Sequence, residues 1–174
     1  MKTKTIEIFE FNELSESAQD KALDNVRQGN YGYDWHEYTY ADAESIGLHL
    51  TGFGLDRDRH ATGNFKDSAE CCAHFIVDNH GDTCETYLTA KAYLTDRDKL
   101  IESAPIDADG ELEREYNLDS DLDNLDNEFL RSILEDYSMQ LQREYEHLDS
   151  KEHLLEMIDC NGYTFTSNGQ IEYV

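Results

Sequence analysis

The sequence predicts an α+β fold in which an antiparallel sheet carries helices packed on one side. Three observations predict this class: a long amphipathic helical pattern towards the C-terminus, a terminal β-hairpin marked by Asn168-Gly169, and alternating runs of strand and helix composition elsewhere. The 174 residues contain no internal repeat and no linker-like stretch. We therefore expect a single acidic α+β domain spanning residues 1–174.

The N-terminal region is expected to hold one strand and two helices. Residues 5–11 have the composition of a short strand, and residues 15–29 have an apolar period of four that is typical of a helix. A second helix is expected over about 34–46, with an aspartate at its start as the cap. On that helix, Trp35 and Tyr38 share one face, and we predict that both belong to the core.

The middle of the chain is predicted to be mainly β-structure. Residues 47–54 read as a strand that leaves into a glycine-containing bend, and residues 55–64 as a charged loop or hairpin tip. Residues 69–77 and 86–94 have strand composition. A short helix is expected to follow over 96–103.

The C-terminal region carries the clearest local patterns. Residues 106–124 are expected to be the least structured, and a long helix is expected over about 125–147. Its apolar side is formed by Phe129, Ile133, Tyr137, Leu141 and Tyr145. A shorter helix capped by Ser150 is expected to end at Asn161-Gly162, before the hairpin.

The net charge of the chain restricts its partners. The formal charge is −25, from 39 acidic and 14 basic residues, and residues 106–174 hold 19 of the acids and only 4 of the bases. Direct binding of nucleic acid is not expected, because the sequence has no basic cluster. The expected partner is a basic protein surface, that of a nucleic-acid-binding host enzyme or of a toxin. Solubility or halophily is the alternative explanation, but halophily predicts an even distribution of acids.

Acidic residues alternate with other residues at the start of this region. In an extended chain, the five acids of residues 107–115 would lie on one face about 6.6 Å apart, comparable to phosphates along one nucleic-acid strand. This spacing predicts a nucleic-acid mimic that occupies the basic groove of a DNA-binding protein. The alternative is a solvated loop with no specific partner. The predicted partner-binding residues are Asp107, Asp109, Glu111, Glu113, Glu115, Asp119, Asp121, Asp123, Asp126, Glu128, Glu135 and Asp136.

Metal binding has weaker support in the sequence. An EF-hand loop that started at Asp119 would have Asn124 in place of the glycine at position 6 and Leu130 in place of the glutamate at position 12. The zinc-ligand types among Cys72, His74, His80 and Cys84 do not follow a known zinc spacing, although Cys72 and His74 would share one face of a strand. We predict no metal site.

Catalytic motifs are missing from the sequence. It contains no nucleophile elbow, no phosphate-binding glycine loop and no H-E-x-x-H motif, since His36-Glu37 is followed by Tyr40 at the position of the second histidine. We therefore expect neither an enzyme nor a cofactor. Tyrosines around Trp35, such as Tyr31 and Tyr33, are a second candidate for a contact surface.

The expected location is the cytoplasm of a bacterial host cell. The sequence has no apolar run of about 18 residues, and its N-terminus lacks the apolar stretch of a signal peptide. In a reducing cytoplasm, the four cysteines Cys71, Cys72, Cys84 and Cys160 are expected to be free thiols. The long helix is compatible with packing inside the chain or with a homodimer.

Several segments resemble a known family. They are residues 11–22, 34–43, 52–54, 142–148 and 161–166, and they occur in the family's order along nearly the whole chain. The sequence is similar here to phage- and plasmid-borne proteins that often carry the label "antitoxin of toxin-antitoxin stability system". The resemblance implies an origin in a phage or another mobile element. Together with the charge, it predicts an anti-defence inhibitor of a restriction or CRISPR effector, or alternatively an antitoxin that neutralises a cognate basic toxin.

Overall fold

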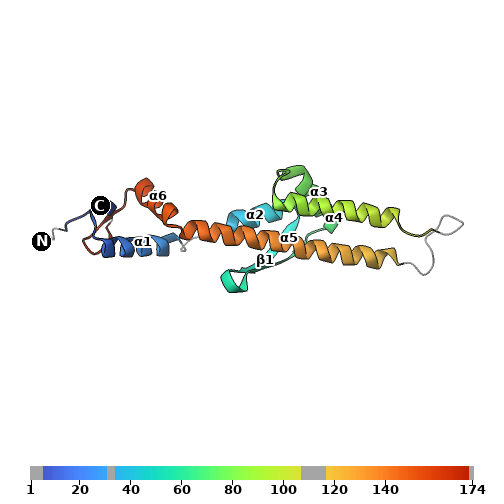
Figure 1. The fold of residues 1–174 in the computed structure, drawn as a ribbon, viewed down its shortest axis with the longest axis horizontal. Coiled ribbons are helices and arrows are strands. Elements are labelled where there is room, and N and C mark those ends of the chain that lie inside the picture. Colours follow the sequence, from blue (N-terminus) through green and yellow to red (C-terminus); the bar gives the residue numbers. More distant parts are fainter. Residues whose placement is uncertain (1–5, 31–33, 107–116, 173–174) are drawn as a thin grey trace. The chain divides into compact units, whose positions relative to one another are not determined.

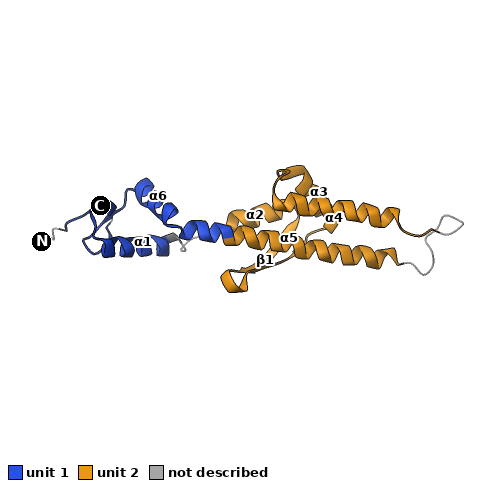
Figure 2. Cartoon of the chain, in the orientation of Figure 1, with its two compact units in different colours: residues 1–36, 143–174 blue, residues 37–142 orange. Residues whose placement is uncertain are grey.

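The computed structural model describes residues 6–30, 34–106 and 117–172 (Figure 1). The chain divides into two compact units, unit 1 with residues 1–36 and 143–174 and unit 2 with residues 37–142 (Figure 2). The prediction of one domain over 1–174 stays a prediction. Among the described helices, none is both long and apolar enough to cross a membrane.

The predicted α+β class is confirmed, with a long C-terminal helix and a terminal strand pair. Helices dominate the described residues, and the strands form two separate antiparallel pairs, β1 with β2 and β3 with β4. The first pair belongs to unit 2 and the second to unit 1.

The β-hairpin of unit 2 joins β1 (Leu48–Gly54) to β2 (His60–Phe65) through the short 3-10 helix η2 (Asp56–Asp58). The predicted strand over 47–54 is confirmed, and the predicted tip over 55–64 is confirmed for 55–59 but wrong for 60–64, which belong to β2. Leu48 pairs with Phe65 and Gly54 with His60, and the register shifts between Leu50 and Gly52. Leu48 and Leu50 lie two positions apart, so they share one face of the strand, and both are buried.

Helix α2 (Glu37–Ser45) precedes this hairpin and is shorter than the predicted helix. Ala43 and the following Ile46 are fully buried, which confirms the apolar end of the predicted pattern. The predicted burial of Tyr38 is wrong, because 84% of this residue is exposed. Trp35 lies before the helix in unit 1 and is half-buried, with its ring 6.2 Å from that of Tyr145.

Two predicted strands are helices in the structure. Residues 69–77 belong to α3 (Ala69–Asn79) and residues 86–94 to α4 (Glu85–Glu102), which also contains residues 96–102 of the predicted helix 96–103. The Ser68 hydroxyl caps α3 by accepting a hydrogen bond from the Cys71 N–H at 3.1 Å. The buried residues of α3 are Ala69, Cys72, Ala73 and Ile76, and those of α4 are Thr86, Ala90 and Tyr93, and both sets recur with helical spacing.

The long helix α5 runs from Leu118 to Asp149 and begins well before the predicted start at 125. The prediction of little structure is therefore wrong for residues 118–124, and residues 107–116 lie outside the described part. In unit 2, its residues Phe129, Ile133 and Tyr137 are buried in the core. The rings of Tyr93 and Phe129 stack with centroids 4.4 Å apart, which joins α4 to α5.

Unit 1 is built from both ends of the chain. It contains the 3-10 helix η1 (Phe11–Glu13), α1 (Glu16–Asn30), the end of α5, and α6 (Lys151–Asn161). The predicted helices over 15–29 and 150–161 are confirmed, and the Ser150 hydroxyl caps α6. The described part of the predicted strand 5–11 is reduced to a single bridge, in which Phe9 exchanges two backbone hydrogen bonds with Phe165.

The terminal hairpin is confirmed, with β3 (Thr164–Phe165) and β4 (Ile171–Glu172) on either side of Asn168-Gly169. Gly169 has φ +83°, and a Cβ at this position would lie 2.2 Å from the backbone oxygen of Ala18. The turn can therefore rest on α1 only because residue 169 is glycine. Phe165 is fully buried in the apolar core between α1 and α6.

Candidate partner-binding site

The twelve predicted partner-binding acids fall into two groups. Asp107, Asp109, Glu111, Glu113 and Glu115 lie outside the described residues, so their alternation along an extended chain stays a prediction. The other seven, Asp119, Asp121, Asp123, Asp126, Glu128, Glu135 and Asp136, all lie on α5. A helix turns about 100° per residue, so acids two positions apart point in nearly opposite directions and not to one face.

Four of these acids are at least partly exposed to water. Asp119, Asp123 and Glu128 are exposed and Asp121 is half-buried. Among the described residues, no cation forms an ion pair with any of the four. Asp119 and Asp121 lie in the first turn of α5, where the helix dipole favours negative charge. Asp119 and Asp123 are separated by about one helical turn, which corresponds to about 6 Å along the helix axis.

The remaining three acids are engaged in packing. The Tyr93 hydroxyl donates a hydrogen bond to Asp126 at 2.6 Å, and the Thr89 hydroxyl donates one to Asp136 at 2.7 Å. Asp136 is only 8% exposed. Glu135 is exposed but forms an ion pair with Arg59. These three side chains attach α4 and the β-hairpin to α5 and are poor substitutes for phosphates.

The buried position of Asp136 changes its acidity. Burial raises the pKa of Asp136, the hydrogen bond from Thr89 lowers it, and the negative charges of Glu85 and Glu135 raise it further. The net direction is upward, so this carboxyl group binds a proton more readily than an exposed aspartate.

Helix α4 contributes two acids that the sequence analysis did not include. The pairs Tyr93–Asp126 and Thr89–Asp136 show that α4 and α5 run antiparallel, and Figure 1 shows the two helices side by side. Residues after Tyr93 therefore lie beside residues before Asp126. This arrangement places the exposed Asp98 and Glu102 at the same end as the start of α5.

We name this group the acidic end of unit 2; it comprises Asp98, Glu102, Asp119, Asp121 and Asp123. The nearby cations of α4 already have acidic partners, since Arg97 pairs with Glu70 at 2.7 Å and Lys99 with Asp96 at 2.9 Å. The signal for Asp98 and Glu102 was present in the sequence as acids at the end of a helix. Only the antiparallel pairing of α4 with α5 brings them to the other three.

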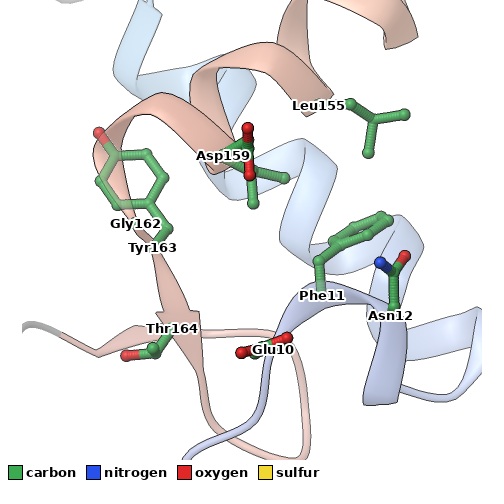
Figure 3. A pocket seen from close by; sticks show the side chains of 9 residues that line it. Glu10, Phe11, Asn12, Leu155, Asp159, Gly162, Tyr163 and Thr164 are labelled. Atoms are coloured by element: carbon green, nitrogen blue, oxygen red, sulfur yellow. The ribbon is translucent and has the colours of Figure 1, made fainter.

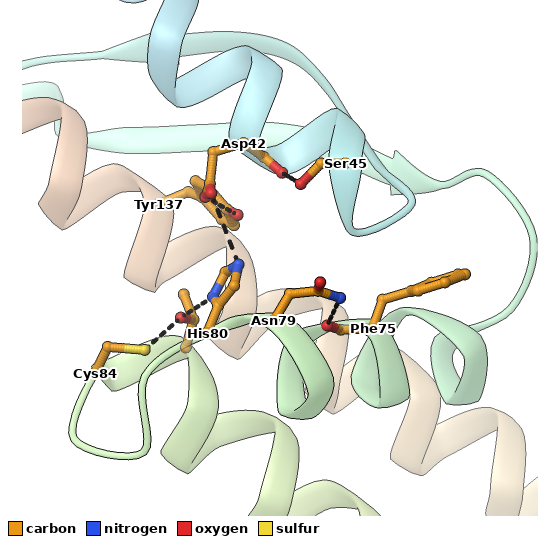
Figure 4. Close-up of polar contacts among 8 residues, drawn as sticks. Asp42, Ser45, Phe75, Asn79, His80, Cys84 and Tyr137 are labelled. Carbon is orange, nitrogen blue, oxygen red and sulfur yellow. Dashed lines mark hydrogen bonds and ion pairs between the residues drawn. The ribbon is translucent and has the colours of Figure 1, made fainter.

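A second polar cluster lies where α2, α4 and α5 meet the end of α3 (Figure 4). The Tyr137 hydroxyl donates to Asp42 at 2.7 Å, and His80 Nδ1 lies 2.7 Å from the Thr86 hydroxyl. The second ring nitrogen of His80 is 3.7 Å from Asp42, beyond hydrogen-bond distance. Thr86 is 1% exposed and its hydroxyl also contacts the Cys84 sulfur at 3.2 Å. The geometry is that of a packed network that joins four helices.

The four zinc-ligand types of the sequence do not converge. Cys72 and His74 lie two positions apart on helix α3 rather than on one face of a strand, so they point in nearly opposite directions. Cys72 is buried, and this burial raises the pKa of its thiol to about 12. Within the described ranges, no group of three or more His, Cys, Asp or Glu residues is arranged to hold a metal ion. All four cysteines are free, as predicted.

Comparisons with known proteins add no relative: no family model, curated protein or solved structure matches this chain.

Proposed function

We propose that this protein is an acidic inhibitor that binds a basic protein surface in place of nucleic acid. The observation that carries the proposal is the acidic end of unit 2, where four exposed carboxylates and the half-buried Asp121 lie at one end of α4 and α5 without a compensating cation among the described residues. Such a surface attracts a nucleic-acid-binding groove through the same long-range charge that nucleic acid uses.

The helix itself does not require this charge distribution. Like charges at positions i and i+4, such as Asp119 and Asp123, reduce helix stability by a few tenths of a kcal/mol. Acids in the first turn are favourable, but Asp123 and Glu128 lie beyond it. A function outside the helix therefore accounts better for these residues than local stability does.

The proposed target is a host defence nuclease, either a restriction enzyme or a CRISPR effector. This part of the proposal is supported by the resemblance to proteins of phages and other mobile elements, together with the charge. An inhibitor of this kind needs no chemistry of its own, and it acts in the cytoplasm of the bacterial host.

The proposal is tested by capture of the target. The tagged protein is incubated with nuclease-treated host lysate, washed in steps of increasing salt, and its partners are identified by mass spectrometry. We expect a nucleic-acid-binding complex that elutes at moderate salt, because the attraction is electrostatic and screened. Salt-insensitive binding, or no partner above background, contradicts the mimic.

A pair of matched variants assigns the binding to the acidic end. The test variant carries D98N, E102Q, D119N, D121N and D123N. The control removes the same number of charges from exposed acids elsewhere, with D20N, D67N, D78N, D82N and E156Q. The test variant should lose the partner and the control should keep it. Equal losses would mean that only the net charge matters.

The second candidate function is an antitoxin, which the family resemblance favours. In this case the captured partner is one small basic protein in near-equal amount, and co-expression relieves its toxicity. The two proposals share a basic partner surface but differ in the size of the partner and its affinity for nucleic acid.

A further inference from the structure

Unit 1 contains an open groove of about 430 Å³ beside the end of α6 (Figure 3). One wall is formed by Glu10 and Phe11, and the other by Leu155, Ile158 and Asp159 on α6. The volume is within the range of small-ligand sites. It is large enough for one long side chain.

Local hydrogen bonds hold both walls of the groove. Gly162 ends α6 in the left-handed conformation, with φ +61°, and the next N–H, of Tyr163, donates to the Ile158 carbonyl at 3.1 Å. On the opposite wall, the Glu10 N–H donates to the Glu13 carboxylate at 2.9 Å. The Phe11 ring packs edge-on against Phe165, with centroids 6.2 Å apart. The groove is therefore formed in advance, which reduces the entropy lost on binding.

The side chains of the groove combine two kinds of chemistry. Glu10 and Asp159 supply exposed carboxylates from two different segments, and Figure 3 shows both at the groove. Phe11, Leu155 and Ile158 supply an apolar surface that includes one aromatic ring. None of the described residues that line the groove is basic. A matching ligand has an apolar stem and a cationic head.

We propose that this groove binds an arginine side chain of the protein partner. The arginine stem covers apolar surface while its head stays near the carboxylates. Its planar guanidinium stacks on an aromatic face and forms paired hydrogen bonds with a carboxylate, which the lysine ammonium cannot do. The inference rests on the proposed function, which requires a basic partner, and adds a contact in unit 1 that selects one residue type.

The test uses the full-length, isotope-labelled protein and the tripeptide acetyl-Gly-Arg-Gly-amide. Its matched control contains citrulline, which has the same shape as arginine but no charge. We expect saturable NMR shifts at the amides of Asn12, Gly162 and Thr164 with the arginine peptide. Citrulline should bind at least about tenfold more weakly, because the charge-assisted hydrogen bonds are lost. Equal shifts with both peptides, or none with either, overturn the inference.

Variants locate the binding to the groove. E10Q/D159N should abolish the shifts, and D20N/E156Q, which removes two exposed acids of unit 1 outside the groove, should preserve them. Unchanged binding in E10Q/D159N overturns the inference. The same titration is repeated with spermidine. Tighter binding of spermidine than of the arginine peptide would indicate a polyamine site and would also overturn the inference.

A negative result in the NMR titration can be distinguished from a negative result in the capture experiment. The tripeptide needs no host target, so its failure leaves a captured nuclease unaffected. Conversely, loss of the acidic-end contact in the capture experiment does not remove the shifts at the groove.

Discussion

The carboxylates that join elements have a cation as partner in unit 1, and hydroxyl groups as well as cations in unit 2. In unit 1, the guanidinium of Arg27 bridges Asp24 and Asp149, the latter at 2.7 Å. In unit 2, three carboxylates accept hydrogen bonds from neutral hydroxyl groups, and only that of Asp136 is buried. These pairs are Tyr137 with Asp42, Tyr93 with Asp126 and Thr89 with Asp136.

The difference affects the charge that each unit presents. A hydroxyl satisfies a carboxylate's hydrogen bonding but leaves its negative charge in place, whereas a cation cancels it. Unit 2 has 25 acids and 8 bases, a net charge of −17, and unit 1 has 14 acids and 6 bases, a net charge of −8. At these three contacts, hydroxyl partners therefore join helices of unit 2 without cancelling charge, while Arg59, Arg97 and Lys99 pair with acids elsewhere in the unit.

The largest expected effect is that of Gly169→Ala in unit 1. The added Cβ would lie 2.2 Å from the Ala18 oxygen, and the φ of +83° is itself unfavourable for alanine. We expect a loss of about 3 kcal/mol in the free energy of unfolding. Amide hydrogen exchange measures the loss for each unit. Protection should fall in unit 1 and persist in unit 2, whereas an equal fall in both would mean that the units unfold together.

Gly162→Ala is the control for this substitution. Gly162 also has a positive φ, +61°, but no atom lies within 4 Å of the added Cβ. Only the backbone strain remains, about 1 kcal/mol. A loss as large as that of Gly169→Ala would show that the contact with Ala18 does not matter.

The next effect is that of Thr89→Val in unit 2. The substitution keeps the shape of the side chain but removes the hydroxyl that donates to the buried Asp136. A buried charged acceptor without its donor should cost about 2 kcal/mol in urea denaturation. The control is Thr95→Val on the same helix, whose hydroxyl donates to the Lys91 carbonyl at an exposed position. It should cost less than about 0.5 kcal/mol. Equal losses would contradict the role of the hydroxyl partner.

Asp136 is also expected to give unit 2 a pH dependence, whose sign follows from its raised pKa. Because burial raises its pKa, the folded state binds the proton more tightly than the unfolded chain does. Its stabilising contribution is present below the unfolded pKa and is lost as the pH rises through the folded pKa. We expect the unfolding free energy of the wild type, relative to Asp136→Asn, to fall with rising pH across this window. A difference that is flat, or that rises, would contradict the upward shift.

The sequence predicted the elements whose signals are local. Asn168-Gly169 specifies a hairpin turn by itself, and Ser150 and Gly162 mark the ends of α6. The prediction for the middle of the chain was wrong because residues such as Ile76 and Val77 are typical of strands. Their strand preference was given more weight than the helical spacing of the apolar residues that are buried on α3. The cap at Ser68, just before this segment, was the overlooked signal.

The candidate site could be predicted only in part, and the reason differs from that for the fold. An acid on an amphipathic helix faces either water or a neighbour, and the sequence of α5 alone does not distinguish Asp123 from Asp126. Thr89 and Tyr93 on α4 make that distinction, and their segment was predicted to be a strand. The same error concealed Asp98 and Glu102, because their position beside α5 depends on the pairing of two helices.

The smallest expected effect is that of Lys66→Ala, which tests whether cations matter for the stability of unit 2. Lys66 forms an ion pair with Glu44, and His49 Nδ1 lies 2.6 Å from the same carboxylate. The hydrogen bonds from Lys66 and then His49 lower the pKa of Glu44. This contribution is present above the unfolded pKa and is lost as the pH falls through the folded pKa, opposite in sign to that of Asp136.

Because the pair is exposed and screened, we expect the unfolding free energy of Lys66→Ala at neutral pH to equal that of the wild type within error, with and without added salt. A loss comparable to that of Thr89→Val would mean that cations, and not hydroxyl groups, hold unit 2 together. The hydroxyl contacts would then not be what lets the helices of unit 2 pack without cancelling charge.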